Sequence, residues 1–282
     1  MAPTESSSGR SKRTSVPDPL PPEFAAAFEA VRARLAPLGR RVLFFNTTAS
    51  TNDLALGLAA DADAEGTVVI ADQQTAGRGR LGRVWHSPPG TGLYVSIVLR
   101  PRSTVTGDDR ATTLLTLAAG LALSEAVEEV TALAPDIKWP NDLLIGRRKL
   151  AGILAESASS DLAHIVLGYG INVGAASLPA DVDARASSLE SELGRAVDRA
   201  ALCAATVVAI AQRYRDLMAG RFDAILDAWR TRSPSSRGSR VRWTTSAGAH
   251  AGVTVGIDER GALLVRAGDR IERIVGGEVT WL

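Results

Sequence analysis

Two lysines stand out among the residues that could do chemistry. The 282-residue chain has 32 basic residues, of which only Lys12, Lys138 and Lys149 are lysine. Lys12 lies in a segment rich in serine and proline, so the folded part keeps lysine at two places. A lysine ammonium is a compact point charge that suits the space between two oxygens, a need that arises when a carboxylate attacks an α-phosphate. The alternative is a strand lysine whose stem covers apolar surface.

The segment KWPND, residues 138–142, indicates where these lysines lie. It places Lys138, Asn141 and Asp142 around a strand end, where Pro140 interrupts the strand pairing. Lys149 follows after a short turn and opens the segment KLAGILAE. A two-stranded hairpin would therefore bring these charges to one end of a sheet.

The segment GRGRLG, residues 77–82, fits the dinucleotide-binding pattern G-x-G-x-x-G. That motif needs its last glycine to open a helix, whereas Gly82 leads into RVWHSPPG, whose prolines and glycine disfavour one. The sequence has no P-loop motif either. What remains is a mobile loop that presents Arg78, Arg80 and Arg83, and arginine pairs bidentately with phosphate or carboxylate. The other interpretation is a solvated basic turn.

Other reactive residue types give weaker signals. Ser50 and Thr51 are by default the cap of a helix through residues 53–60, and Trp85 and Trp139 fit a core with a bonded N–H. The three histidines lack metal-ligand spacing, and Cys203 sits in an apolar helix, so we expect neither a metal site nor a cysteine nucleophile.

Composition narrows the class of protein. With 45% apolar residues and a net charge of +1, the chain can fill a core but has no global field that would draw it to nucleic acid or a membrane. A single cysteine fits a reducing compartment, the apolar runs are too short for a membrane span, and the N-terminus lacks the apolar core of a signal peptide. We expect a cytoplasmic protein.

The elements that must position these residues follow from periodicity and turn signals. We expect helices at residues 22–35, 53–60, 109–130, 199–218 and 222–232. We expect strands at residues 42–46, 67–74 and 93–100, the last with alternating character, and in DIKWP, DLLI, KLAGILAES and AHIVLGYGINV, with short turns such as 146–148 and 159–161. After a linker at SPSSRGS, residues 240–282 alternate as short strands with turns at AGAHAG, DERG and AGDR.

These elements predict an α/β (α+β) fold, with a mixed, largely antiparallel sheet flanked by helices and followed by a small SH3-like β-barrel. The expected divisions are a disordered tail at residues 1–22, a catalytic domain at 23–235 and a small C-terminal barrel at 236–282.

Taken together, STN (50–52), QQTAGRGRLGRVW (73–85), KWPND, KLAGILAE and GYGIN (168–172) resemble, in this order and spacing, the catalytic domain of biotin protein ligases. The resemblance is close over residues 42–175 and weak over 176–240, and GIDERGALLV with GGEVTW resembles the family's small C-terminal domain. It implies a core related to class II tRNA synthetases. It also implies an enzyme that makes biotinyl-5'-adenylate from biotin and ATP and transfers biotin to a lysine of a biotin carboxyl-carrier domain, as in acetyl-CoA carboxylase.

The resemblance also implies roles for individual residues. Lys149 would touch both the biotin carboxylate and the α-phosphate, Asp142 would orient or deprotonate the carrier lysine, and Arg78 is a third catalytic candidate. Magnesium would bridge the phosphates of ATP, held largely by the substrate. The implied biotin-binding residues are Ser50, Thr51, Asn52, Gln74, Arg78, Gly79, Arg80, Trp85, Lys149 and Gly152. The implied ATP-binding residues are Arg80, Arg83, Trp85, Lys138, Asn141, Lys149 and Asn172.

Some members of that family carry an N-terminal helix-turn-helix domain and repress transcription. Ahead of the catalytic segment this sequence predicts a tail and one helix, too little for such a domain. We therefore expect a ligase without repressor function, acting as a monomer or weak homodimer.

Two other functions compete. A lipoate ligase or related acyl-adenylate transferase could use the same scaffold, although KWPND with GRGR favours biotin. An RNA-binding module would place the loop arginines on phosphates and Trp85 against bases, but the near-zero net charge argues against it.

Overall fold

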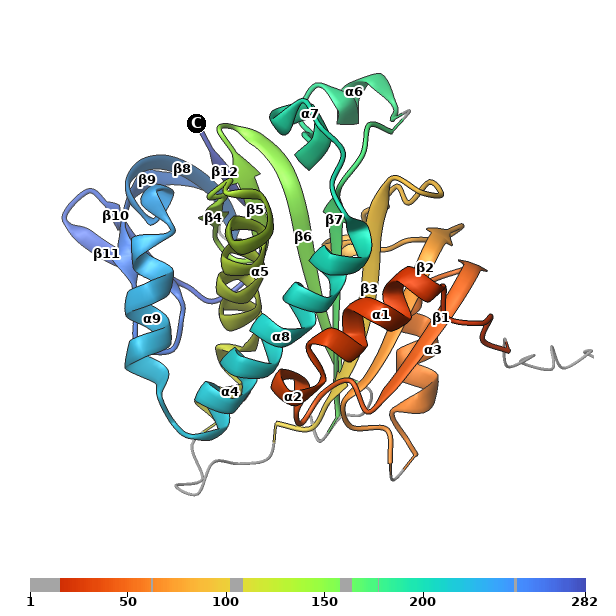
Figure 1. Cartoon of the computed structure of the whole chain (residues 1–282). Coiled ribbons are helices and arrows are strands. Elements are labelled where there is room, and N and C mark those ends of the chain that lie inside the picture. Colours follow the sequence, from red (N-terminus) through yellow and green to blue (C-terminus); the bar gives the residue numbers. More distant parts are fainter. Residues whose placement is uncertain (1–15, 62, 102–108, 158–163, 177, 246–247) are drawn as a thin grey trace, which may run out of the picture.

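The computed structural model describes residues 16–61, 63–101, 109–157, 164–176, 178–245 and 248–282, and its strands form two sheets (Figure 1). The larger sheet has seven strands in the order β1-β2-β3-β7-β6-β5-β4, and the smaller has five in the order β11-β10-β9-β8-β12. In the larger sheet β1 and β2 pair in parallel, and the other neighbours are antiparallel. The expected mixed, largely antiparallel sheet is confirmed.

The strands of the larger sheet are β1 (Arg41–Thr48), β2 (Thr67–Gln74), β3 (Gly92–Leu99), β4 (Asp136–Lys138), β5 (Asp142–Ile145), β6 (Arg148–Ser157) and β7 (Ile165–Asn172). Those of the smaller sheet are β8 (Arg237–Thr245), β9 (Gly248–Ile257), β10 (Leu263–Ala267), β11 (Arg270–Ile274) and β12 (Val279–Trp281). The helices are α1 (Pro22–Ala30), α2 (Arg32–Leu35), α3 (Thr51–Leu58), α4 (Arg110–Thr113), α5 (Leu115–Thr131), α6 (Ala180–Asp183), α7 (Leu189–Leu193), α8 (Arg199–Met218) and α9 (Phe222–Thr231), with 3-10 turns η1 (Arg80–Gly82) and η2 (Pro234–Ser236).

Helices cover both faces of the larger sheet. On one face α5 and α8 pack together, with α1 on α8 and α9 on α5 (Figure 1). On the other face α3 packs against β2, β3 and β7. The main apolar cluster extends from the larger sheet through α5, α8 and α9 to Val241, Leu263 and Val265 of the smaller sheet. This shared core fixes the smaller sheet beside the end of the larger one.

Burial on both faces overturns the alternating character expected for residues 93–100. Every residue of β3 is buried, because β3 lies between β2 and β7. Ile97 faces the main cluster and Val98 faces the smaller cluster under α3. A central strand covered on both faces has no solvent side that would demand polar residues.

Three local expectations were wrong at element ends. The helix expected over residues 22–35 divides at Val31, whose ψ of 7° ends α1 before α2 begins. Ser50 precedes α3 without a side-chain capping bond, and Gln74 accepts the N–H of Thr51. Residues 248–252, expected to be a turn, belong to β9.

The segment expected to be a linker, SPSSRGS, is ordered and partly buried. Ser233 and Ser236 are both buried, and the hydroxyl of Ser233 donates to the carbonyl of Ile137 at 2.7 Å. Within the predicted disordered tail, Asp18 bridges to Phe44 of β1, so residues 16–21 follow the sheet edge. The turn expected at 159–161 lies outside the described residues.

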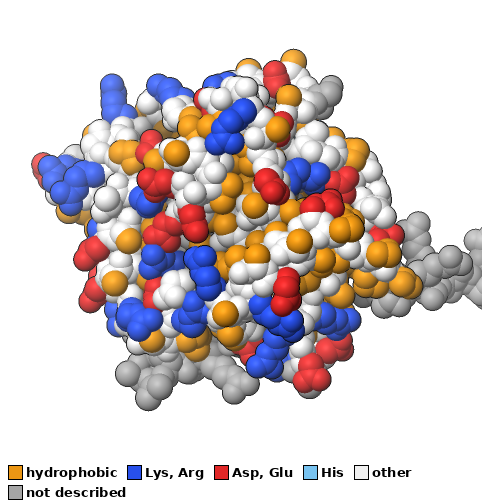
Figure 2. Space-filling model, in the orientation of Figure 1, with side chains coloured by type: hydrophobic (Ala, Val, Ile, Leu, Met, Phe, Trp, Pro, Cys, Tyr) orange, Lys and Arg blue, Asp and Glu red, His pale blue; other side chains and the backbone are white. Residues whose placement is uncertain are grey.

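Charges of both signs are interspersed on the face that carries α1, α8 and α9 (Figure 2). None of the described helices is long and apolar enough to cross a membrane.

Candidate functional site

A cavity of about 700 Å³ lies where the ends of β4, β5, β6 and β7 meet α3, the loop after β2, and β12 of the smaller sheet. That volume suits a ligand of drug or cofactor size. The sequence-predicted residues that line it are Ser50, Thr51, Asn52, Gln74, Arg78, Gly79, Arg80, Arg83, Trp85, Lys138, Asn141, Asp142, Lys149, Gly152 and Asn172. The structure thus brings together every predicted site residue, although not every side chain points the same way.

One end of the cavity is a buried polar cluster. Ser50, Thr51 and Asn52 are at most 5% exposed at the start of α3. Gln74 Oε1 accepts from the N–H of Thr51 at 2.9 Å and from its hydroxyl at 3.2 Å. The hydroxyl of Ser96, from β3, lies 2.8 Å from Thr51 Oγ1 and 2.5 Å from Asn52 Oδ1. This end can recognise a small ring bearing both donors and acceptors.

The indole of Trp85 forms one wall and lies on a pair of glycines. Gly152 of β6 and Gly170 of β7 are direct cross-strand partners. A Cβ on Gly170 would stand 2.4 Å from Trp85 Nε1, and one on Gly152 would stand 3.0 Å from Trp85 Cζ3. The Trp85 Nε1 group is buried and has no hydrogen-bond partner among the described residues. An unpaired buried donor of this kind is uncommon in folded proteins.

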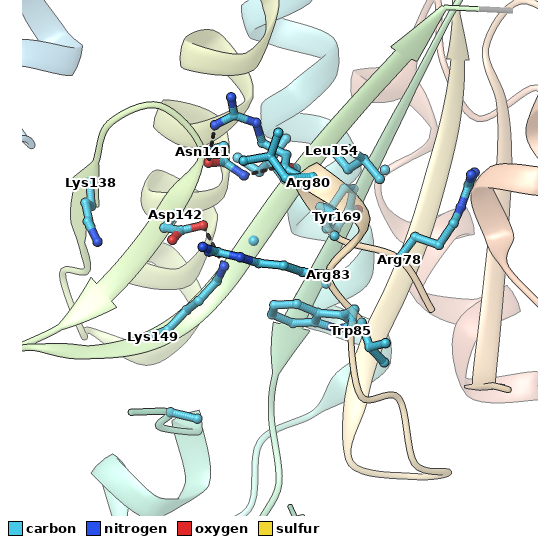
Figure 3. Close-up of a pocket in the computed structure, with 18 of the residues that line it drawn as sticks. Arg78, Arg80, Arg83, Trp85, Lys138, Asn141, Asp142, Lys149, Leu154 and Tyr169 are labelled. Carbon is cyan, nitrogen blue, oxygen red and sulfur yellow. Dashed lines mark hydrogen bonds and ion pairs between the residues drawn. The ribbon is translucent and has the colours of Figure 1, made fainter. Parts of the chain in front are cut away.

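Lysines and carboxylates gather at the other end, where the hairpin predicted from KWPND is confirmed. Lys149 Nζ lies 2.7 Å from Asp142 Oδ1 and 5.3 Å from the centroid of the Trp85 ring (Figure 3). Lys138 Nζ lies 4.7 Å from the ring of Trp281, which belongs to β12. The smaller sheet therefore completes this end of the cavity.

The cavity is strongly basic although the whole chain is nearly neutral. Its lining has two carboxylates, Asp142 and Glu278, against the basic side chains Arg78, Arg80, Arg83, Lys138, Arg147, Lys149 and Arg185. Burial lowers the pKa of Lys138, an effect that Asp142 opposes and Lys149 adds to. Burial likewise lowers the pKa of Arg80. Such a lining attracts an anion carrying several charges.

The three arginines of the 77–85 loop point in different directions (Figure 3). Arg80 donates to Asn141 Oδ1 at 3.2 Å, and Arg83 pairs with Glu278, the residue before β12. Arg78 points away from Lys149, and its guanidinium pairs with Asp53 at 2.7 Å and Glu156 at 2.9 Å. The structure therefore does not bring the charge of Arg78 to the lysines.

Asn172 and Gly77 have structural roles at the backbone around the cavity. Asn172 Nδ2 donates to the carbonyls of Lys149 and Ser187 at 3.3 and 3.0 Å, which joins β6 to the segment after α6. Gly77 approaches the carbonyl of Trp85 so closely that a Cβ would stand 2.4 Å from it. At Gly79 the nearest such contact is 3.5 Å, so that glycine is not required sterically here.

The residues that sequence reasoning missed are Asp53, Gly77, Ser87, Ser96, Glu156, Gly168, Gly170, Glu278 and Trp281. Six of these residues lie within motifs whose individual members were not singled out: Gly168 and Gly170 in GYGIN, Glu278 and Trp281 in GGEVTW, Gly77 in QQTAGRGRLGRVW and Glu156 in KLAGILAE. Ser96 sits in a strand whose apolar pattern gave no signal.

Two expected core residues are confirmed. Trp139 is buried and donates its Nε1 to the carbonyl of Gly261 at 2.9 Å. Cys203 is fully buried in α8, and burial raises its pKa to about 12. Across the described ranges, no group of three or more His, Cys, Asp or Glu side chains could hold a metal ion.

Comparisons with known proteins agree on one relationship. A model of the biotin/lipoate A/B protein ligase family matches residues 44–172, and a model of the biotin protein ligase C-terminal domain matches residues 238–280. The bifunctional ligase/repressor BirA of Bacillus subtilis is 35% identical over 246 residues, or 86% of this chain and 74% of that protein.

Two further relatives bear on the reaction. The biotin–[acetyl-CoA-carboxylase] ligase of Mycobacterium tuberculosis is 37% identical over 250 residues, or 83% of this chain and 86% of that protein. The biotin protein ligase of Aquifex aeolicus, solved in complex with biotin and ATP, has a TM-score of 0.74 and 29% identity, and the match covers 86% of this chain and 99% of that one.

Proposed function

The chain belongs to the biotin protein ligase family, and on this premise we propose how its cavity performs the reaction. The protein is a biotin–[acetyl-CoA-carboxylase] ligase, an enzyme that joins biotin to a lysine of a carboxyl-carrier protein at the expense of ATP. The observation that carries the assignment to this cavity is the Lys149–Asp142 pair, which lies in a basic lining opposite a buried polar cluster.

Biotin would enter with its ureido ring at the polar end. The hydroxyls and amides of Ser50, Thr51, Asn52 and Gln74 offer both donors and acceptors to the ring. Trp85 would pack along the ring and tail, and the carboxylate would then reach Lys149. The length of the cavity separates recognition of the ring from the reacting end.

In the first step a carboxylate oxygen of biotin attacks the α-phosphorus of ATP, the bond to the β-phosphate breaks, and pyrophosphate leaves. Both reactants are anions, so the main task of the enzyme is to place positive charge where they meet. Lys149 is proposed to contact both the carboxylate and the α-phosphate. Arg80, Arg83 and Lys138 would hold the phosphates, with Asn141 fixing Arg80 and Asn172 fixing the backbone of Lys149.

In the second step the carrier lysine attacks the acyl carbon of the adenylate and AMP leaves. A lysine ammonium must lose a proton before its nitrogen can attack, and Asp142 is the carboxylate beside Lys149 that could accept or orient that proton. The loop that carries Arg80 and Trp85 would shield the mixed anhydride from water until the carrier arrives.

Magnesium is part of the proposal as the companion of ATP. The cavity offers it two carboxylates, and each is already paired, Asp142 with Lys149 and Glu278 with Arg83. That set is too small for a protein cage, so the phosphates would supply most of the ligands and the metal would offset their charge.

The proposal extends to a ligase without repressor function that acts in the cytoplasm. In the described chain, α1 and α2 pack on α8 instead of forming a separate DNA-binding unit. The buried, single Cys203 requires no oxidising compartment.

The test is pyrophosphate release with biotin and ATP but no carrier, measured on wild type and Lys149→Ala. We expect a burst near one equivalent with biotin, none with lipoate, and at least a roughly hundredfold slower burst in the variant, because one preorganised donor is worth ~3 kcal/mol. A burst with lipoate would favour the lipoate ligase alternative, and an undiminished burst in Lys149→Ala would remove Lys149 from the chemistry.

A further inference from the structure

Glu156 of β6 lies outside the cavity lining and yet joins two parts of it. Its Oε2 atom accepts from Asn52 Nδ2 at 2.6 Å and from the guanidinium of Arg78 at 2.9 Å. Asn52 belongs to the polar end of the cavity, and Arg78 belongs to the loop that carries the other wall. One carboxylate oxygen therefore contacts both sides of the proposed biotin site.

At its inner end this contact fixes the orientation of Asn52. The side chain is 5% exposed, its Oδ1 accepts from Ser96, and its Nδ2 faces the carboxylate of Glu156. A donor on one side and an acceptor on the other permit a single amide orientation. The absence of a side chain at Gly168 makes space for this amide, because a Cβ there would stand 2.0 Å from Asn52 Oδ1.

At its outer end the contact holds the loop. Arg78 is placed between Glu156 and Asp53, which lie on β6 and α3, and it points away from the lysines (Figure 3). The same loop carries Trp85, which forms the cavity wall. An arginine fork held by two carboxylates sets the position of the backbone that bears it.

We propose that Glu156 is a positioning residue for biotin, and that Arg78 serves as the anchor of the loop through it instead of supplying charge to the reaction. This inference rests on the proposed function. The carboxylate holds Asn52 in the orientation that the ring meets and seats the loop whose Trp85 covers the same ligand. Recognition of biotin thus depends on a residue that does not touch it.

The variant Glu156→Gln distinguishes the roles of the two contacts. Its neutral amide oxygen can still accept from Asn52, but it can no longer form an ion pair with Arg78. We expect the KM for biotin to rise roughly tenfold, the size expected for one charge-assisted hydrogen bond, while the KM for ATP changes less than about threefold. Trypsin should cleave the variant faster after Arg78, Arg80 or Arg83. The matched control is Glu128→Gln, which removes a carboxylate paired with Arg232 on the surface of α5 and should change neither KM.

A double-mutant cycle with Arg78→Gln tests the anchor. If Glu156 acts through Arg78, the double variant should be no worse for biotin than the poorer single variant. Additive losses, or a biotin KM of Glu156→Gln within about twofold of wild type, would overturn the inference. Thermal unfolding of each variant identifies any loss of fold, and Arg78→Gln, at a partly exposed side chain, tests the loop if Glu156→Gln unfolds. No activity in the wild type would instead refute the proposed function.

Discussion

Gly170→Ala tests whether Trp85 must lie flat on the glycine pair. Gly170 has an ordinary strand backbone, so alanine introduces no backbone strain of its own. Its new Cβ would stand 2.4, 2.5 and 2.8 Å from Nε1, Cε2 and Cζ2 of the indole. Carbon contacts are favourable at about 3.5–4.0 Å, so the ring must move by about 1 Å.

That displacement sets the expected magnitude. A shift of ~1 Å in a group that positions a substrate can cost about a hundredfold in rate, and overpacking strain of about 1–3 kcal/mol gives a range of roughly fivefold to more than a hundredfold. We therefore expect kcat/KM for biotin to fall between roughly tenfold and a hundredfold. Gly152→Ala should weaken biotin binding less, because its contact with the indole is 3.0 Å, whereas its contacts of 3.1 Å with Lys149 would affect the rate of the reaction.

The assay is biotin-dependent pyrophosphate release, with calorimetric binding of biotin and thermal unfolding measured on the same preparations. The control is Gly57→Ala in α3, where an added Cβ meets nothing within 4 Å. There replacement of a glycine in the last turn of α3 should stabilise the protein by at most about 0.5–1 kcal/mol without changing activity. If Gly170→Ala unfolds normally and keeps wild-type kcat/KM, the assignment of Trp85 to the cavity wall is refuted. If Gly152→Ala loses more biotin affinity than Gly170→Ala, the steric reasoning is refuted.

Three further predictions concern titratable groups. Burial lowers the pKa of Lys138, so the KM for ATP should rise at a pH below the usual lysine range, and Lys138→Arg, which stays charged, should flatten that alkaline limb in steady-state assays. Burial of Asp216 opposes its ionisation, but hydrogen bonds from Arg221 and Gln212 and the charge of Arg213 outweigh this and lower its pKa. The stabilisation it gives is present above the unfolded pKa of about 3.9 and lost as pH falls through the folded value. Asp216→Asn should therefore lower Tm at pH 7, and its Tm should fall less than that of wild type when the pH is then lowered. An identical acid dependence of Tm in the two proteins would contradict the assignment. Cys203, with burial raising its pKa to about 12, should react with a thiol reagent at neutral pH only as the protein unfolds, so rapid labelling of the native protein would show that α8 opens locally.

Local signals in the sequence determined most elements. Residues 67–74 and 199–218 were predicted with the bounds that β2 and α8 have. Periodicity and turn residues act within a segment, so they can be interpreted without knowing its neighbours. The hairpin that joins Lys149 to Asp142 was predictable for the same reason, because a short turn leaves few ways to pair two strands.

Neighbouring elements decided the places where those signals failed. Residues 93–100 were assigned a solvent face that β3 lacks, because helices on both sides of the sheet bury it. Ser233 and Ser236 of the expected linker are buried, and their hydroxyls donate to the carbonyls of Ile137 in β4 and of Ser233. Composition alone cannot show that a polar segment has found such partners.

For the site too, some features follow from the sequence and others only from the tertiary structure. The sequence by itself determined which residue types gather, because the rare lysines, the arginine loop and the motifs mark them. Only the tertiary structure decided how they act together, since the contacts that orient them join residues far apart in the chain, such as Asn52 with Glu156 and Arg83 with Glu278. Spacing along a sequence carries no information on such contacts. They exist because folding places α3, β6 and the segment that leads into β12 around one cavity, and the cost of burying a polar group favours a partner for the buried amide of Asn52.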